Sequence, residues 1–417
     1  MNLAERKWLR LFTLGLLFFA QGIPWGFMAI TLYGYLAEHG ATADTLANVT
    51  TATVLPFAFK WVAGPIVDAF SSKRFGRRRP WIVGAQLMMA LSLAALLLLG
   101  DFGEHVTLLF ILIFAHTVFN ALQNVAVDGL AIDLLDKAER GRASGIMYGS
   151  KYLGGMAGSA GIGVVIAHAG MRAGIVVMVI VLLAIMVVPL FVKERPAEQL
   201  EQLTQLSVAA KLTATLRSIG QAFSTRNAQL TALVMVWMNL ALGMLNPVSG
   251  VLFMQHLGWK QEEYSAVTGG FGLPAGFVAS LAAGFLADLV GRRRLAALAC
   301  ATTAAGWLTF ALNPQWWHDH SFIYALSIVE PLSNAVLTVS LWALCMDTSN
   351  PKVGATQFAV YTSLTNLSTV VGAKLLGANA LSWWTFRQTY IVAALLQLVI
   401  IGLLPLIRPP RRAPASA

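Results

Sequence analysis

Charged residues are scarce in this 417-residue sequence, at 12% of all residues, whereas 57% are hydrophobic. Soluble domains carry about 25% charged residues. A chain of this length and composition would lack the polar side chains needed to cover a surface exposed to water. The low charge therefore excludes an ordinary soluble protein and indicates a membrane protein whose solvent is lipid.

Cysteine is nearly absent too, since only Cys300 and Cys345 occur, each inside an apolar stretch. That excludes a disulfide framework and predicts two buried thiols. The sequence also shows no nucleophile–base pair, phosphate loop or metal-ligand cluster. His318 and His320 fall in the loop "WWHDH", where we expect incidental polar residues rather than a metal site. We expect no enzyme activity, no cofactor and no metal.

Acidic residues are fewer than basic ones, 19 against 29, so the formal net charge is +10. A nucleic-acid-binding protein would gather its cations on one folded face. Here they form short clusters between apolar runs, as in "SSKRFGRRRPW" at 71–81. This pattern is typical of the cytoplasmic loops of membrane proteins. The expected partners are the lipid bilayer and a small molecule, not nucleic acid.

The apolar runs predict an all-α membrane protein, because backbone in lipid must satisfy its own hydrogen bonds. About twelve runs reach the roughly 20 residues that cross a bilayer. We place the spans near 8–34, 44–70, 79–100, 105–133, 142–168, 171–193, 227–255, 261–290, 293–312, 319–346, 352–379 and 384–407.

Lys and Arg concentrate in every second loop, on the side of the N-terminus. By the positive-inside rule, this predicts that both termini and the long 194–226 loop are cytoplasmic. The loop divides the chain into bundles of six spans at 1–193 and 227–417, joined by a cytoplasmic linker at 194–226. Leu200, Leu203 and Leu206 recur in the linker at helical spacing and predict a surface helix along the membrane.

Two short echoes suggest an internal repeat. "GPIVDAFSSKRFGRRRPW" at 64–81, after span 2, is matched by "GFLADLVGRRR" at 284–294, after span 8. "HTVFNA" at 116–121 in span 4 lines up with "EPLSNA" at 330–335 in span 10. With the six-plus-six layout, they predict two related bundles with pseudo-two-fold symmetry.

The layout and the Gly-x-x-x-Asp motif followed by basic residues resemble the major facilitator superfamily over nearly the whole chain. The resemblance implies two halves that rock about a central site to give alternating access. It implies gating by charge pairs at the cytoplasmic rim, with glycines that allow close backbone approach. The alternative is that the basic residues only set topology. The gating residues we expect are Gly64, Asp68, Arg77, Arg78, Gly284, Asp288, Arg292 and Arg293.

A narrower resemblance is carried by "FAQGIPWG", "LPFAFKWVAGPIVDAF", "LQNVAVDGLAIDLLDKAERGRASG" and, in the second half, "GATQFAVYTSL". These look like the peptide/acetyl-CoA/drug:proton symporter branch, which includes AmpG-type muropeptide permeases and siderophore permeases. Such proteins tend to have Gln-Asp in span 4, where this chain has Gln123-Asn124. A carboxylate expected in the transport path is missing there, and Asp128 lies one turn later.

Ionisable residues within spans cost about 2.5 to 3.5 kcal/mol each, so each requires a reason. Glu330 lies roughly mid-membrane in span 10 and is our first choice for the coupling proton, with Asp128 second. The alternative for Glu330 is a static pair with a buried lysine. Lys151, also near the middle of its span, would contact an anionic substrate group or act as a counter-ion.

Further polar and aromatic residues would line a substrate cavity. Gly and Pro interrupt spans 1 and 7 at corresponding positions, beside Gln21 and Asn246, and interrupted spans point to a binding site. Polar stripes also hold helices together, and aromatic residues also anchor span ends, so both alternatives stay open. The substrate-binding residues we expect are Gln21, Asn120, Gln123, Asn124, Lys151, Trp237, Asn246, Asn334 and Tyr361.

The resemblance and the polar residues together predict a transporter of the bacterial inner membrane, acting as a monomer. It would import a medium-sized polar or anionic solute, such as a muropeptide, with protons. The alternatives are siderophore import, drug/proton efflux or, less favoured, a receptor or enzyme of the membrane.

Overall fold

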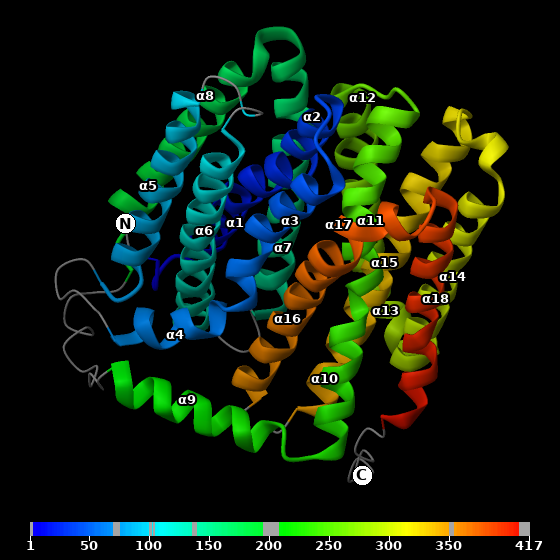
Figure 1. Cartoon of the computed structure of the whole chain (residues 1–417). Coiled ribbons are helices and arrows are strands. Elements are labelled where there is room, and N and C mark those ends of the chain that lie inside the picture. The colour runs from blue at the N-terminus through cyan, green and yellow to red at the C-terminus, as the bar shows by residue number, and fades with distance from the viewer. Residues whose placement is uncertain are drawn as a thin grey trace.

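The chain forms long helices that stand side by side in two groups (Figure 1). The computed structural model describes residues 3–69, 76–99, 102, 105–135, 140–194, 208–349 and 354–407. In the view of Figure 1, the first group, blue to teal, lies at the left, and the second, green to red, lies at the right.

The first half contains six spans. Span 1 is α1 (Lys7–Gly26), η1 (Phe27–Thr31) and α2 (Leu32–Glu38), and span 2 is α3 (Ala43–Ala58) and α4 (Lys60–Ala69). Span 3 is α5 (Arg79–Ala95) with η2 (Leu96–Leu98), and span 4 is α6 (Val106–Leu134). Spans 5 and 6 are α7 (Arg140–Met156), η3 (Ala157–Gly161) and α8 (Ile162–Phe191).

The second half follows α9 (Val208–Ala222) and repeats this layout. Span 7 is α10 (Arg226–Met238), α11 (Leu240–Val251) and η5 (Leu252–His256), and span 8 is α12 (Gln261–Ser265), η6 (Ala266–Gly272) and α13 (Leu273–Val290). Span 9 is α14 (Arg292–Leu312), followed by η7 (Pro314–Trp316), and span 10 is α15 (His320–Thr348). Span 11 is α16 (Gly354–Val371), η8 (Gly372–Gly377) and α17 (Ala378–Trp383), and span 12 is α18 (Phe386–Leu403) with η9 (Leu404–Leu406).

By length and hydropathy alone, nine helical stretches of the described residues could cross a membrane. One of them, Gly145–Phe191, contains two spans, because Gly170 has φ 82° and breaks the helical geometry inside α8. The helices of spans 2 and 11 supply the remaining two. Each of the twelve spans expected from the sequence therefore has a helical counterpart with similar bounds.

The Gly and Pro residues of spans 1 and 7 do not interrupt the helix, contrary to the sequence-based expectation. Pro24 lies inside α1 and Pro247 inside α11, and each helix continues into a π-helical turn, η1 or η5. A π-turn lets the backbone hydrogen bonds shift register without ending the helix. The π-turns occupy corresponding places in the two halves, which supports the internal repeat.

Gly64 and Gly284 were expected to let two helix backbones approach closely, but in this structure no described atom lies close to either glycine. A Cβ atom added to either would meet no described atom within 4 Å. The close contacts lie between spans 1 and 5 and between spans 7 and 11, where an added Cβ would come closer than 3.0 Å to a facing backbone atom. The glycines concerned are Gly22, Gly26, Gly154 and Gly158 in the first half and Gly243, Gly372 and Gly377 in the second.

One end of the molecule, here called the linker end, holds the start of the chain, α9 and the turns before spans 3 and 9. There the backbone N–H of Leu3 donates to Lys193 O at 2.9 Å, and Gln357 Nε2 donates to Ala222 O at 3.1 Å. Helix α9 contacts α4 of the first half and α16 of the second, and it runs along the lower side of Figure 1. The leucines at 200, 203 and 206, which predicted a linker helix, lie outside the described residues.

Among the described residues, the apolar core that both halves share lies toward the opposite end, here called the closed end. In the described part of the chain, one apolar cluster combines Tyr33 and Leu46 of the first half with Val251 and Trp259 of the second. Toward the linker end, each half has a cluster of its own, one built around α1, α6 and α7 and the other around α10, α14, α15 and α16. Nearer the linker end, the halves meet through individual contacts such as that of Tyr148 with Trp342, whose ring centres lie 6.3 Å apart.

Candidate functional site

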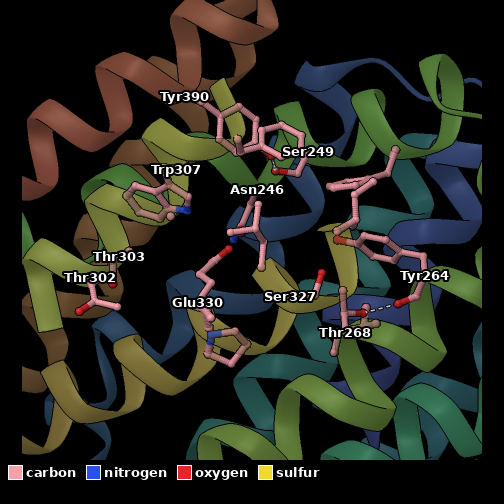
Figure 2. Close-up of a pocket in the computed structure, with 18 of the residues that line it drawn as sticks. Asn246, Ser249, Tyr264, Thr268, Thr302, Thr303, Trp307, Ser327, Glu330 and Tyr390 are labelled. Carbon is pink, nitrogen blue, oxygen red and sulfur yellow. Dashed lines mark hydrogen bonds between the residues drawn. The ribbon is translucent and has the colours of Figure 1, made fainter. Parts of the chain in front are cut away.

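A cavity of about 250 Å³ lies within the second half and contains Glu330 (Figure 2). Its walls come from spans 7, 8, 9, 10 and 12, and span 1 contributes Ala29 and Ile30. Glu330 is the eleventh residue of α15, which places it about 15 Å from the start of that helix at 1.5 Å per residue. The acid and Asn246, both expected from the sequence to be functional, therefore share one cavity.

The Glu330 carboxyl lies among aromatic side chains. Trp307 is 4% exposed, and its indole Nε1 points toward Glu330 in Figure 2. This N–H interacts with the Glu330 carboxyl, although the contact falls short of full hydrogen-bond geometry. Tyr264 and Tyr390 interact electrostatically with Glu330 from spans 8 and 12. A single carboxyl in such surroundings can take up a proton or donate and accept hydrogen bonds with a bound molecule.

Hydroxyl groups complete the polar part of the cavity. Ser249 Oγ and Tyr390 Oη lie 2.9 Å apart, and Thr268 Oγ1 donates to Tyr264 O at 2.6 Å. Thr302 and Ser327 also line the space. Because these side chains come from five different spans, the cavity exists only when the second half is assembled.

A second polar cluster lies in the first half, on spans 2, 4 and 5. Asp128 interacts electrostatically with Lys60 and Lys151. The Lys151 ammonium lies 5.5 Å from the ring centre of Phe57 and 6.0 Å from that of Trp25. The cluster brings together Asp128 and Lys151, two residues expected to act in coupling and binding, and adds Lys60 of span 2.

The polar stripe of span 4 makes contacts between helices. Asn124 Nδ2 donates to Gln21 Oε1 at 3.1 Å, and Asn120 Nδ2 donates to Gln21 O at 3.4 Å. Gln123 Nε2 turns the other way and donates to Gln86 Oε1 of span 3 at 2.8 Å. In this state these four expected binding residues, Gln21 included, hold spans 1, 3 and 4 together.

Three other expected binding residues lie outside the Glu330 cavity. Tyr361 is fully buried at the linker end, where its hydroxyl donates to Ala228 O at 3.2 Å and accepts from Gln357. Trp237 packs against the apolar cluster that contains Tyr361. Asn334 lies one turn after Glu330 on α15.

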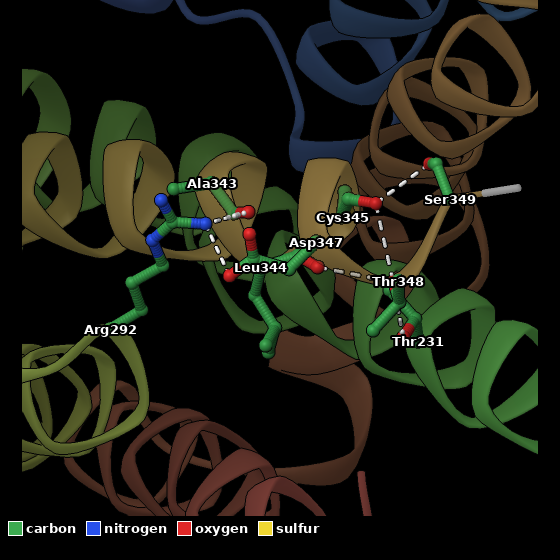
Figure 3. Close-up of polar contacts among 8 residues, drawn as sticks. All are labelled: Thr231, Arg292, Ala343, Leu344, Cys345, Asp347, Thr348 and Ser349. Atoms are coloured by element: carbon green, nitrogen blue, oxygen red, sulfur yellow. Dashed lines mark hydrogen bonds and ion pairs between the residues drawn. The ribbon is translucent and has the colours of Figure 1, made fainter. Parts of the chain in front are cut away.

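Two of the expected gate residues, Arg78 and Arg292, form ion pairs, each with a partner that was not expected from the sequence. Arg78 Nε lies 3.1 Å from Asp133 Oδ2, at the end of span 4, and Glu194 Oε2 accepts from the backbone N–H of Arg78 at 3.0 Å. In the second half, Arg292 pairs with Asp347, and its Nη1 donates to Ala343 O at 2.8 Å (Figure 3). Each pair ties the start of the third span of its half to the end of the fourth.

These pairs lie within one half each. The side chains of Asp68 and Asp288 lie outside the part of the chain that the structure describes, so their role stays a prediction. Arg77 and Arg293 are partly buried beside the paired arginines. The internal repeat matches Asp133 with Asp347, because these two residues are as far apart along the chain as His116 and Glu330 are. The repeat could therefore have revealed both partners.

Side chains at the closed end connect the two halves, and none of them was singled out from the sequence as functional. Glu38 Oε1 lies 3.3 Å from Lys260 Nζ, and Lys374 Nζ lies 2.6 Å from Asp44 Oδ1. Gln255 Nε2 donates to the backbone oxygens of Ala37 and Ala41, at 3.0 and 2.9 Å. These residues lie near span ends, where polar side chains are ordinary, so no sequence pattern marked them.

The position in the first half that corresponds to Glu330 is His116, and it differs in its surroundings. His116 is buried, and its Nδ1 lies 3.1 Å from Ser92 Oγ and 3.0 Å from Met89 O. The repeat thus supplies the helical frame twice, whereas the acid-containing cavity is a property of the second half.

Comparison with known proteins identifies relatives of the whole chain. A family model described as the Major Facilitator Superfamily matches residues 11–241 and again residues 231–417. The anhydromuropeptide permease of Escherichia coli strain K12 is 24% identical over 392 residues, which cover 92% of this chain and 77% of the permease.

Solved structures share the fold at low identity. The nucleoside transporter NupG, solved as a point mutant, superposes with a TM-score of 0.76 at 12% identity, covering 95% of this chain and 99% of that one. A D-xylose–proton symporter has a TM-score of 0.68 at 14% identity, covering 94% and 98% of the two chains.

Proposed function

Because the chain belongs to the Major Facilitator Superfamily and is a multi-pass membrane transporter, we propose that it imports a medium-sized, polar or anionic solute, a muropeptide in the first instance, together with protons. The observation that carries the proposal is the similarity to anhydromuropeptide permease, which extends over 92% of this chain. The membrane would be the bacterial inner membrane, with both termini and the linker end in the cytoplasm.

The structure supports this proposal through the placement of its ionisable groups. Glu330 would carry the coupling proton, since it lies at mid-span in a cavity. The Lys151 ammonium in the first half would attract an anionic group of the solute. With the linker end cytoplasmic, the closed end would be periplasmic, and its contacts between the halves would have to part before solute could enter from outside.

Uptake into proteoliposomes tests the proposal. Vesicles containing the protein would be given labelled anhydromuropeptide with and without an inward proton gradient. We expect accumulation above the outside concentration only with the gradient, and none in protein-free vesicles. If the vesicles accumulate an iron-loaded siderophore but not muropeptide, the transported solute is a siderophore. If they move hydrophobic drugs outward instead, the protein is an efflux transporter and not an importer.

A further inference from the structure

The Glu330 cavity is too small for a whole medium-sized solute. Pockets that hold drug-sized ligands measure about 300–1,000 Å³, whereas this one measures about 250 Å³. It can therefore take one part of such a solute, about the size of a single ring. Which part it takes depends on the chemistry of its walls.

The cavity walls favour a neutral, hydroxylated group. No lysine, arginine or histidine is among the described residues that line it, so a carboxylate or phosphate of the solute would find no counter-charge there. The acid Glu330, the amide of Asn246 and the hydroxyls of Ser249, Thr302 and Ser327 offer both donors and acceptors. A hydroxylated ring can use both kinds of hydrogen bond.

Aromatic rings occupy the rest of the walls. Trp307, Tyr264 and Tyr390 reach the cavity from three different spans, and Phe253 and Phe310 pack beside them. The C–H faces of a sugar ring pack well against aromatic faces, while its hydroxyls point sideways to polar groups. Aromatic side chains with a polar edge suit such an amphipathic ligand.

Trp307 places a buried N–H at the cavity wall. Its side chain is 4% exposed, and its Nε1 points toward the Glu330 carboxyl, with which it interacts without reaching full hydrogen-bond geometry. A hydroxyl or amide oxygen of a bound ring can accept from this N–H, while the Glu330 carboxyl serves the other hydroxyls of the ring.

From these four features we propose that the cavity around Glu330 and Trp307 binds a sugar ring of the transported solute. This proposal rests on the proposed function, because it assigns the sugar portion of a sugar-peptide to the second half. The anionic peptide portion is excluded from this cavity for lack of a cation. Trp307 then determines specificity for the sugar.

The test measures binding to the full-length protein in lipid nanodiscs, by calorimetry, with three probes: anhydromuropeptide, its sugar portion without peptide, and the free peptide. Trp307→Phe keeps an aromatic ring and removes the N–H. We expect this variant to bind both sugar-containing probes about tenfold more weakly, the size expected for one lost hydrogen bond. Its affinity for the free peptide should not change.

Trp383→Phe is the matched control, because Trp383 is 55% exposed and lies outside the cavity. Tyr390→Phe is a second variant in case Trp307→Phe does not fold, and it should also weaken the sugar-containing probes selectively. Unchanged sugar binding in the variant that folds, or an equal loss for sugar and free peptide, would overturn the proposal.

The wild-type results separate this proposal from the proposed function. If the sugar portion binds but intact muropeptide does not, the cargo is wrong and the sugar site stands. If muropeptide binds and only free peptide competes with it, the sugar site is wrong and the cargo stands. If none of the three probes binds, both are wrong.

Discussion

Glu38, the last residue of α2 in the first half, accepts a hydrogen bond from the backbone N–H of Gln261, the first residue of α12 in the second. The distance from this nitrogen to Glu38 Oε2 is 3.0 Å. A carboxylate at a helix N-terminus satisfies an otherwise free N–H and opposes the positive end of the helix dipole. In return, Gln255 of span 7 donates to Ala37 O and Ala41 O where span 1 ends. The two halves thus cap each other's helices at the closed end.

This reciprocal capping predicts that Glu38→Ala opens the closed end. Loss of a helix cap costs about 0.5–2 kcal/mol, and the ion pair with Lys260 adds little, because the lysine is 78% exposed. A loss of about 1–2 kcal/mol changes the ratio of open to closed molecules by a factor of about 5 to 30. To measure opening, a cysteine is placed at Leu46, which is buried at this end (Leu46→Cys). A thiol reagent that does not cross membranes then labels this reporter cysteine only when the end is open.

Labelling of the reporter should rise about tenfold in Glu38→Ala and stay unchanged in Glu262→Ala. Glu262 is an exposed acid in the same first turn of α12 and serves as the control. The native thiols give little background, since Cys300 and Cys345 are both buried. Equal labelling of Leu46→Cys with and without the Glu38 substitution would mean that the caps do not hold this end shut.

Proton coupling predicts a separate effect of Glu330→Gln. Glutamine keeps the shape and hydrogen bonds of a neutral carboxyl but cannot release a proton. We expect the variant to exchange labelled solute across vesicles at a rate near that of the wild type, yet to fail to accumulate it under a proton gradient. Uphill accumulation that persists in Glu330→Gln would transfer the coupling role to Asp128, which Asp128→Asn would then test.

The ion pairs at the linker end predict coupling between Arg78 and Asp133. Arg78 is 6% exposed, so removal of its partner leaves a nearly buried charge. A double-mutant cycle with Arg78→Gln and Asp133→Asn should give an interaction energy of about 1–3 kcal/mol in the free energy of unfolding. The same cycle for Arg292 and Asp347 should give a smaller value, because those side chains are more exposed. Additive effects in the first cycle would show that the Arg78–Asp133 contact contributes no stability.

Glycine packing predicts opposite outcomes for two sets of Gly→Ala substitutions. Gly154→Ala and Gly372→Ala place a methyl group against the backbone oxygens of Phe19 and Leu240, so we expect losses of expression and thermal stability. Gly64→Ala has open space and gains helix propensity, about 1 kcal/mol in an exposed helix. It should fold normally.

The transport rate of Gly64→Ala distinguishes the roles left open for that position. Slow transport by a stable Gly64→Ala protein would mean that close approach at Gly64 occurs in the other conformational state. Transport at the wild-type rate would remove Gly64 from the gate and leave the Asp68 side chain to be tested separately with Asp68→Asn.

The sequence by itself determined the spans and the repeat. In a membrane, helix is the required structure for runs of this length, and the hydropathy of each run indicates where it begins and ends. This is why the expected bounds of spans such as 261–290 agree with the helices. Glu330 was also evident from the sequence, because an acid inside an apolar run is costly wherever the run packs.

Only the tertiary structure decided what each polar group faces. The spacing along α6 puts Asn120 and Asn124 on one side, but whether that side meets span 1 or a cavity depends on how the helices pack. Trp307 looks like an ordinary apolar residue of span 9 until spans 7, 8, 10 and 12 enclose it with Glu330. Glu38 and Gln261 are 223 residues apart and meet because the two halves lean together at one end. Contacts of this kind depend on the relative placement of whole bundles, which no local pattern in the chain encodes.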